Sequence, residues 1–223
     1  MTSENTRADL RYLNGFGNEF QSESILGALP LGRNSPQRPA HGLFAELISG
    51  TAFTAPRAEN RRTWLYRTLP TAVAVRFAPY EQPLWTHVAN HEAVAPDPMR
   101  WRPTEIPADT DFIDGLRAMA VNGDPDLQVG MAALIYVASK SMVDRVIVNT
   151  DAEMLLVPQL GPLLLTTELG LLEVRPGEVS IIPRGMAFSV GLPEGQSRGY
   201  VCENFGNHFR LPELGPIGSN GLA

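Results

Sequence analysis

The sequence predicts a mainly β protein, built as an antiparallel β-sandwich or barrel with long ordered loops and one or two short helices. From residue 131 onward, short apolar segments follow one another, and turn residues separate them at the spacing expected of antiparallel strands. The first third of the chain is instead rich in glycine, proline and asparagine, as ordered loops are. With 223 residues, 43% of them hydrophobic, the chain can bury one large core or two small ones.

Residues 1–130 are expected to form a loop-rich β region. The segments 12–20 and 27–42 place glycines, prolines and asparagines between single hydrophobic anchors. Two short runs, 42–49 and 71–77, indicate strands. Together with residues 131–223, this region is expected to form one domain.

One helix is predicted near residues 110–121. Asp109 or Thr110 would cap its start, and Asn122 with Gly123 would stop it. The apolar residues recur with the helical period, so that one face carries Phe112, Ile113, Leu116, Met119 and Ala120.

Residues 131–223 are expected to form the barrel core. Its strand segments alternate or run continuously apolar and are bounded by turn signals; they are 131–138, 145–149, 153–158, 162–167, 171–174, 178–182, 187–190 and 199–204. Cys202 lies in the last of these and is expected to be a small buried thiol rather than a nucleophile.

Charge and cysteine content exclude several classes of partner and compartment. The formal net charge is −6, from 24 acidic and 18 basic residues, and no basic run is long enough to follow a phosphate backbone, so no nucleic acid partner is expected. No apolar run approaches the roughly 20 residues that span a bilayer, so no membrane association is expected. A single cysteine and a polar first segment indicate the cytoplasm.

Residues 151–188 resemble the cupin family of jelly-roll barrels. The second cupin motif has Pro-Gly-acid, an apolar run, and then Pro-x-Gly-x-x-His; here it begins at Pro176 and ends with Phe188 in the place of the histidine. Counted back from Gly161, the first motif would place two histidines and a glutamate near Val148, Thr150 and Met154.

All four ligand positions of that resemblance are therefore apolar or weakly coordinating. Without imidazole, thiolate or carboxylate groups, an iron, manganese or zinc ion has nothing to replace its water shell. We expect a barrel filled by side chains, with no metal ligand and no catalytic residue in this chain.

His87 and His91 are a second candidate metal pair, with Glu92 beside them. On a strand the two histidines would lie about 13 Å apart, at roughly 3.3 Å per residue, and could not share an ion. On a helix they would lie one turn apart and could share one, although Glu92 would point away from them. The other interpretation is a surface loop or short helix with solvated imidazoles.

A basic and aromatic cluster lies in residues 59–67. Arg61, Arg62 and Arg67 flank Trp64, which is a composition suited to binding an anion or to stacking at a subunit interface. The other interpretation is a solvated basic turn with one buried aromatic side chain.

Long and irregular segments of the chain resemble the amino-terminal half of the homogentisate 1,2-dioxygenase family. They are YLNGFGNEF (12–20), SGTAFTAPRAENRRTWLYR (49–67), RGMAFSV (184–190) and NHFRLPELGPIGSNGLA (207–223). The resemblance implies a cytoplasmic Fe(II) enzyme of tyrosine and phenylalanine breakdown that uses O2 to convert homogentisate to maleylacetoacetate. It also implies trimers that pair into hexamers.

In that family the iron is held by two histidines and one glutamate of the carboxy-terminal half. The resemblance thus implies that the iron ligands lie beyond residue 223, that this chain alone binds no iron, and that its main partner is the carboxy-terminal half. The chain ends in a glycine-rich loop, so we expect it to be a fragment of a longer protein. The alternative function is a stand-alone, metal-free cupin-like module that binds a small molecule or a protein.

Overall fold

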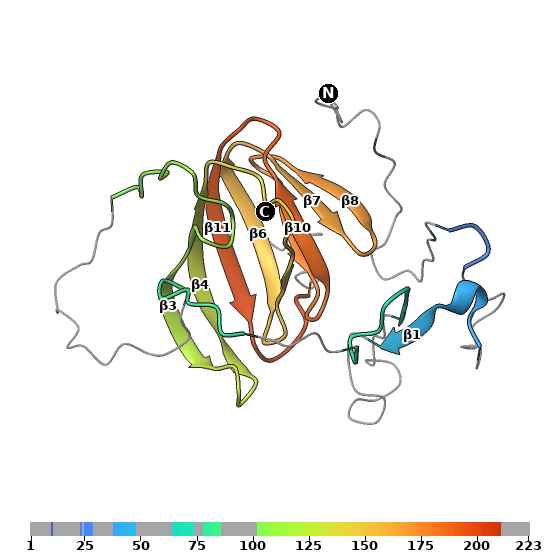
Figure 1. Cartoon of the computed structure of the whole chain (residues 1–223). Helices are drawn as coiled ribbons and strands as arrows, with labels where there is room; N and C mark the ends of the chain where they lie inside the picture. Colours follow the sequence, from blue (N-terminus) through green and yellow to red (C-terminus); the bar gives the residue numbers. More distant parts are fainter. Residues whose placement is uncertain are drawn as a thin grey trace, which may run out of the picture.

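The computed structural model of the chain describes residues 10, 23, 25–28, 38–47, 64–73, 78–85 and 102–210. Regular structure within these residues is almost wholly β (Figure 1). The elements are η2 Ala40–Gly42, β1 Phe44–Leu47, β2 Trp64–Arg67, β3 Leu116–Asp124, β4 Val129–Ala138, β5 Ile147–Val148, β6 Glu153–Leu160, β7 Leu163–Thr167, β8 Gly170–Val174, β9 Ser180–Ile182, β10 Ala187–Gly191 and β11 Ser197–Asn204. No helix in the described ranges is long and apolar enough to cross a membrane.

Two antiparallel sheets make up the body of the molecule (Figure 1). The first has five strands in the order β3-β4-β11-β6-β9, and the second has four strands in the order β5-β10-β7-β8. β1 and β2 form a separate two-stranded ribbon. The predicted fold class, an antiparallel β-sandwich or barrel, is confirmed.

The core lies between the two sheets because side chains alternate between the faces of each strand. On β4, Ala132, Leu134 and Tyr136 are fully buried, whereas the residues between them are more exposed. The second sheet contributes Leu165 and Val190 to the same apolar cluster. The barrel interior is therefore filled by side chains from both sheets.

Gly199 allows β11 to lie tightly between β4 and β6. A Cβ at this position would lie 2.3 Å from the backbone oxygen of Val157 and 2.7 Å from Cε1 of Tyr136. A register shift between Arg198 and Gly199 marks the same place in the pairing with β6. Only a glycine fits this close approach of backbone and aromatic ring.

The helix predicted near residues 110–121 is wrong. Residues 112–115 form a turn, and β3 then runs from Leu116 to Asp124. The Asp111 side chain accepts hydrogen bonds from the backbone N–H groups of Ile113 and Asp114, so these two donors are paired within the turn. Pairing with β4 then outcompetes the helix, because Leu116, Ala118 and Val121 reach the core only as strand residues, with a bulge between Ala118 and Ala120.

The predicted boundary between the loop-rich region (1–130) and the barrel core (131–223) is wrong. The five-stranded sheet begins at Leu116 and not at residue 131. β3 and the start of β4, which that division assigned to the loop-rich part, form one hairpin of the sheet. The strand predicted at 42–49 is present as β1. In the strand predicted at 71–77, residues 71–73 form a turn and 74–77 lie outside the described residues, as do 12–20.

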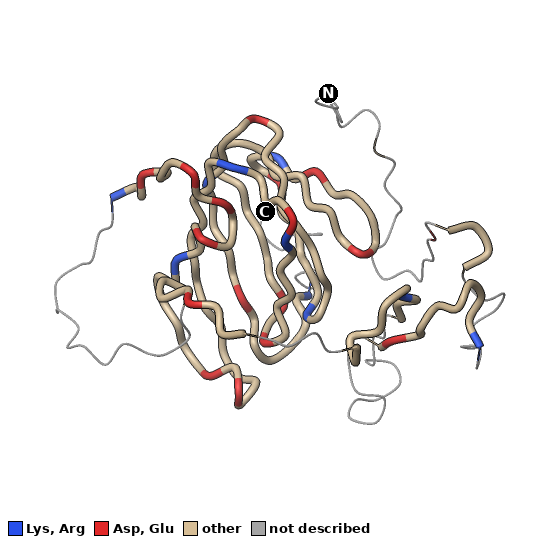
Figure 2. The backbone as a smooth tube through the Cα atoms, viewed as in Figure 1, with Lys and Arg blue, Asp and Glu red and all other residues tan. Residues whose placement is uncertain are grey.

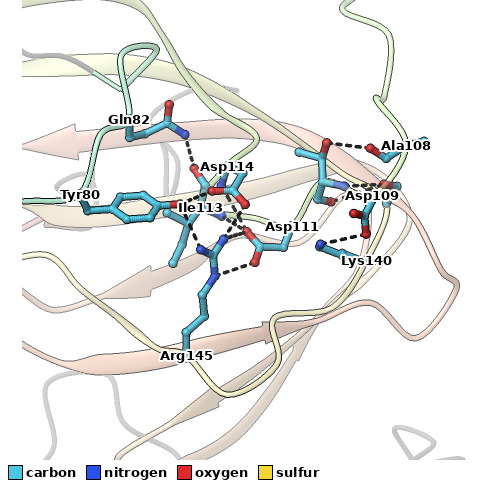
Figure 3. A network of polar contacts seen from close by, with 11 residues as sticks. Tyr80, Gln82, Ala108, Asp109, Asp111, Ile113, Asp114, Lys140 and Arg145 are labelled. Atoms are coloured by element: carbon cyan, nitrogen blue, oxygen red, sulfur yellow. Dashed lines mark hydrogen bonds and ion pairs between the residues drawn. The ribbon is translucent and has the colours of Figure 1, made fainter.

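Residues 78–85 lie along the barrel and are attached by a polar network centred on Arg145 (Figure 3). The guanidinium donates to Asp111 through Nε, at 2.7 Å, and through Nη2, and it also contacts Asp114 at 2.8 Å. Tyr80 donates its hydroxyl hydrogen to Asp114 and accepts one from Arg145. Hydrogen bonds to Asp111, followed by the hydroxyl of Tyr80, raise the pKa of Arg145, so it stays charged.

Replacement of Asp111 by alanine should destabilise the fold. Asp111 is 4% exposed, and its loss removes both the turn's acceptor and the main partner of Arg145. We expect a loss of about 2 to 3 kcal/mol in the free energy of unfolding, less than for a fully buried pair because Arg145 is partly solvated. Chemical denaturation measures it.

Lys140→Ala is the matched control, because it removes the neighbouring but exposed ion pair with Asp109. Its denaturation midpoint should equal that of the parent chain. Equal midpoints for Asp111→Ala and the parent would show that the Arg145 network contributes nothing to stability.

Candidate functional site

The four positions that resemble cupin ligands do not all face the barrel interior. Phe188 is 1% exposed and Met154 is fully buried. Val148 is 45% exposed and Thr150 is exposed as well. In the pairing of β5 with β10, Ile147 lies opposite Phe188, so these two share the inner face.

The inward-facing positions near β5 are therefore Ile147 and Asn149, which corrects the assignment of Val148 and Thr150. Ile147 is 5% exposed and Asn149 is 6% exposed. Because side chains alternate with a period of two, an error of one residue in the spacing moves every assigned position to the opposite face. The corrected set still contains no imidazole, thiolate or carboxylate.

Phe188 fills the space that the motif assigns to a histidine. Its ring meets that of Phe112 edge to face, with the ring centroids 6.3 Å apart, and Phe112 in turn packs on Tyr136 at 5.2 Å. Such aromatic pairs stabilise beyond the burial of their area. Phe188, at the end of the second cupin-like motif, therefore has a packing role in the core.

A buried polar group lies next to this apolar set. Glu203 on β11 is fully buried and pairs in register with Met154, so the two side chains are neighbours on the inner face. Its carboxylate accepts hydrogen bonds from the amide of Asn149 and, at 3.3 Å, from the indole N–H of Trp85. Glu203 was not among the predicted site residues, although alternation along β11 and into the residue after it places 201, 203 and 205 on one face.

Among the described residues, the groups around Glu203 do not fit a metal ion. Asn149 presents its NH2 group to the carboxylate, while its oxygen accepts the backbone N–H groups of Asp151 and Ala152. The Trp85 indole can only donate. One carboxylate surrounded by donors lacks the ligand count that iron or zinc requires, and the described part of the chain contains no group of three or more His, Cys, Asp or Glu placed to hold a metal ion.

The two histidines within the described residues, His41 and His208, do not form a metal site. His41 lies exposed in η2, and His208 contacts Glu153 through Nδ1. His87 and His91 lie outside the described residues. Glu153 also accepts the backbone N–H of Phe209 at 2.8 Å, so this pair fastens the chain as it leaves β11.

The guanidinium of Arg67 is already paired with carboxylates of this chain, so it is not available to bind an anion. It donates to both oxygens of Glu168, at 2.6 Å each, and to Glu46. The hydrogen bonds to Glu168 and Glu46 raise its pKa. Trp64 is 45% exposed. Arg61 and Arg62 lie outside the described residues.

Two further titratable groups are held in their protonated form. Burial raises the pKa of Tyr136 to about 12, and its hydroxyl shares a 2.9 Å hydrogen bond with Ser197. Burial also raises the pKa of the Cys202 thiol, which is 4% exposed, as expected for a structural cysteine. Neither group is poised as a nucleophile or base.

Replacement of Phe188 should destabilise the barrel. Phe188→Ala should cost about 3 to 5 kcal/mol through lost burial and a residual cavity. Phe188→His should also lower stability, because it buries a polar ring among apolar neighbours. Val148→Ala, on the outer face of the adjacent strand, is the control. Denaturation midpoints like the parent's for both Phe188 variants would refute the packing role.

Replacement of Glu203 should remove an acceptor from the buried Asn149 amide and from the partly buried Trp85 indole. Glu203→Leu should cost about 1 to 3 kcal/mol for each donor left unpaired, whereas Glu203→Leu combined with Asn149→Leu should recover part of that loss. Thermal or chemical unfolding of the single and double variants measures the coupling. A double variant whose loss equals the sum of the two single losses would contradict the direct contact.

Comparison with known proteins gives a family match over nearly the whole chain and partial similarity to several solved structures. Residues 11–223 match the family described as homogentisate 1,2-dioxygenase N-terminal. Solved structures with similarity include a cupin-2 domain protein from Shewanella frigidimarina (16% identity, 40% of this chain and 78% of that chain, TM-score 0.33), KdgF from a Halomonas species (14%, 49% and 90%, TM-score 0.34) and the conserved protein SPY1581 of unknown function from Streptococcus pyogenes (10%, 53% and 100%, TM-score 0.39). Because the family match covers nearly the whole chain, this chain belongs to the homogentisate 1,2-dioxygenase N-terminal family.

Proposed function

We propose that this chain is the amino-terminal part of an Fe(II)-dependent, ring-cleaving dioxygenase of the cytoplasm that converts homogentisate and O2 to maleylacetoacetate. The observation that carries the proposal is the family match over residues 11–223. In this proposal the chain supplies the scaffold and the subunit interface. The iron ligands lie beyond residue 223.

The packed interior supports a scaffold role. The positions that would hold a metal in the cupin pattern are occupied by Ile147, Asn149, Met154 and Phe188, all 6% exposed or less. A small aromatic substrate has no room among such side chains, since protein interiors pack as densely as organic crystals. Substrate binding is therefore assigned to the complete enzyme and not to the centre of this barrel.

The proposed partners are the carboxy-terminal half of the same protein and further copies of the subunit, as trimers that pair. Iron and O2 would provide the ring-opening chemistry in the other half. The contribution of this chain is to hold that half in place, because a ligand set displaced by about 1 Å can lose much of its rate. No step of the reaction is assigned to a residue of this chain.

The first test is metal content. Because the residues of the barrel interior do not fit iron, the isolated chain should retain no stoichiometric Fe(II) and show no ring-opening activity after dialysis against a chelator. Elemental analysis and an assay with homogentisate and O2 measure both. One tightly held iron per chain would overturn the assignment of the ligands to the other half.

The second test is complementation. Neither half should convert homogentisate alone, and the mixed or coexpressed halves should regain Fe(II)-dependent activity, followed by the absorbance of the product. A carboxy-terminal half that is fully active without this chain would refute the scaffold role. A monodisperse, monomeric chain without affinity for the other half would instead favour the stand-alone binding module.

A further inference from the structure

The indole of Trp85 reaches the barrel interior from a segment that otherwise lies on the surface. We call this segment, residues 78–85, the strap; Glu81, Pro83 and Leu84 within it are exposed. Trp85 is only partly exposed and packs against the apolar core cluster. One side chain of the strap therefore points inward while its neighbours stay in solvent. The charges of the chain lie along the surface loops and strand ends around it (Figure 2).

The indole N–H of Trp85 points at a buried acceptor. Glu203 is fully buried on β11, and its Oε2 atom lies 3.3 Å from Nε1 of Trp85. The other carboxylate oxygen accepts a hydrogen bond from the side-chain amide of Asn149. Asn149 is itself fixed, because its oxygen accepts two backbone N–H groups. The carboxylate is therefore held in one orientation, with one oxygen directed toward the ring.

The sheet provides room for a flat ring beside this carboxylate. Across the inner face, Glu203 lies opposite Ala132 on β4, and Ala132 lies opposite Val121 on β3. Ala132 has only a methyl group but is fully buried, so larger groups must cover it. Trp85 and Val121 both pack against the core cluster that contains Ala132. A small residue next to a buried acceptor thus makes a place for an aromatic ring that carries a donor.

Contacts elsewhere in the strap fix the position of the ring. The backbone oxygen of Leu84 accepts the N–H of Ala118 at 2.7 Å, on the edge strand β3. The side-chain amide of Gln82 donates to the backbone oxygen of Ile113 at 2.7 Å (Figure 3). The 3.3 Å between indole and carboxylate is longer than the about 2.7–2.9 Å of a charge-assisted hydrogen bond. A ring that is not attached to the strap is free to approach the carboxylate more closely.

We propose that the end of the barrel at Glu203 is a binding site for a flat aromatic heterocycle with an N–H donor, and that Trp85 occupies it as an intramolecular ligand. The carboxylate selects the donor, and the apolar residues around Ala132 select the flat ring. When the strap lifts, the site becomes available to a small molecule of the same chemistry. The proposal concerns the barrel alone and does not depend on the proposed enzymatic function.

Removal of the indole side chain should open the site. Trp85→Ala should bind free indole with a dissociation constant on the order of 0.1 to 1 mM, and the parent chain should bind it at least tenfold more weakly, because its own indole fills the site. Benzofuran has the shape of indole but an oxygen acceptor in place of the N–H. It should therefore bind Trp85→Ala at least tenfold more weakly than indole does. Isothermal titration calorimetry measures both probes.

Trp64→Ala is the matched control, because Trp64 is 45% exposed on β2. This variant should bind indole no better than the parent chain. If Trp85→Ala does not fold alone, millimolar indole should restore its β-type circular dichroism spectrum and benzofuran should not. The proposal is overturned if indole neither binds nor rescues Trp85→Ala, if the two probes bind it equally, or if Trp64→Ala binds indole as well as Trp85→Ala does.

A second variant tests the N–H donor without emptying the site. Trp85→Phe keeps an aromatic ring but removes the donor to Glu203, so the strap should be held less firmly. The backbone N–H of Ala118, which donates to Leu84 of the strap, should then exchange with solvent about tenfold faster than in the parent chain. Trp64→Phe should leave that rate unchanged. Equal rates at Ala118 in Trp85→Phe and the parent would show that the indole N–H does not hold the strap, and the proposal would be wrong.

Discussion

The rest of the structure depends on the pairing of β11 with β4 on one side and with β6 on the other. This double pairing joins segments from residues 129–138, 153–160 and 197–204 into the centre of one sheet. It is possible because Gly199 has no side chain where the backbone of β6 and the ring of Tyr136 approach most closely. This pairing sets which residues of the three strands line the core face of the sheet and which line its outer face.

The alternation along β11 then separates two roles. Val201, Glu203 and Phe205 point inward, where they pack against the second sheet or hold Asn149 and Trp85. Tyr200 and Cys202 point outward, into the apolar face. One strand therefore contributes both to the packed core between the sheets and to the apolar outer face of the five-stranded sheet.

The amino-terminal segments are fastened to this barrel mainly by polar contacts. Arg145 connects residues 78–85 to the turn at Asp111, and Arg67 connects the β1–β2 ribbon to Glu168 after β7 (Figure 3). A two-stranded ribbon is marginal by itself in water and needs such support. The Arg145–Tyr80 and Arg67–Glu168 contacts join residues 65 and 101 positions apart, which no local pattern could indicate.

The mainly β class, most strands after residue 131, the buried Phe188 and the family could all be predicted from the sequence, because they follow from alternation, turn residues and long specific segments. The sequence did not determine the state of residues 110–121, whose apolar spacing fits a helix locally and a strand once β4 is present. Nor did it determine which residues near β5 face inward, since a shift of one residue reverses every side chain. Only the tertiary structure decided these points and brought Asn149, Glu203 and Trp85 together, because cross-strand pairing joins residues that are far apart in the chain.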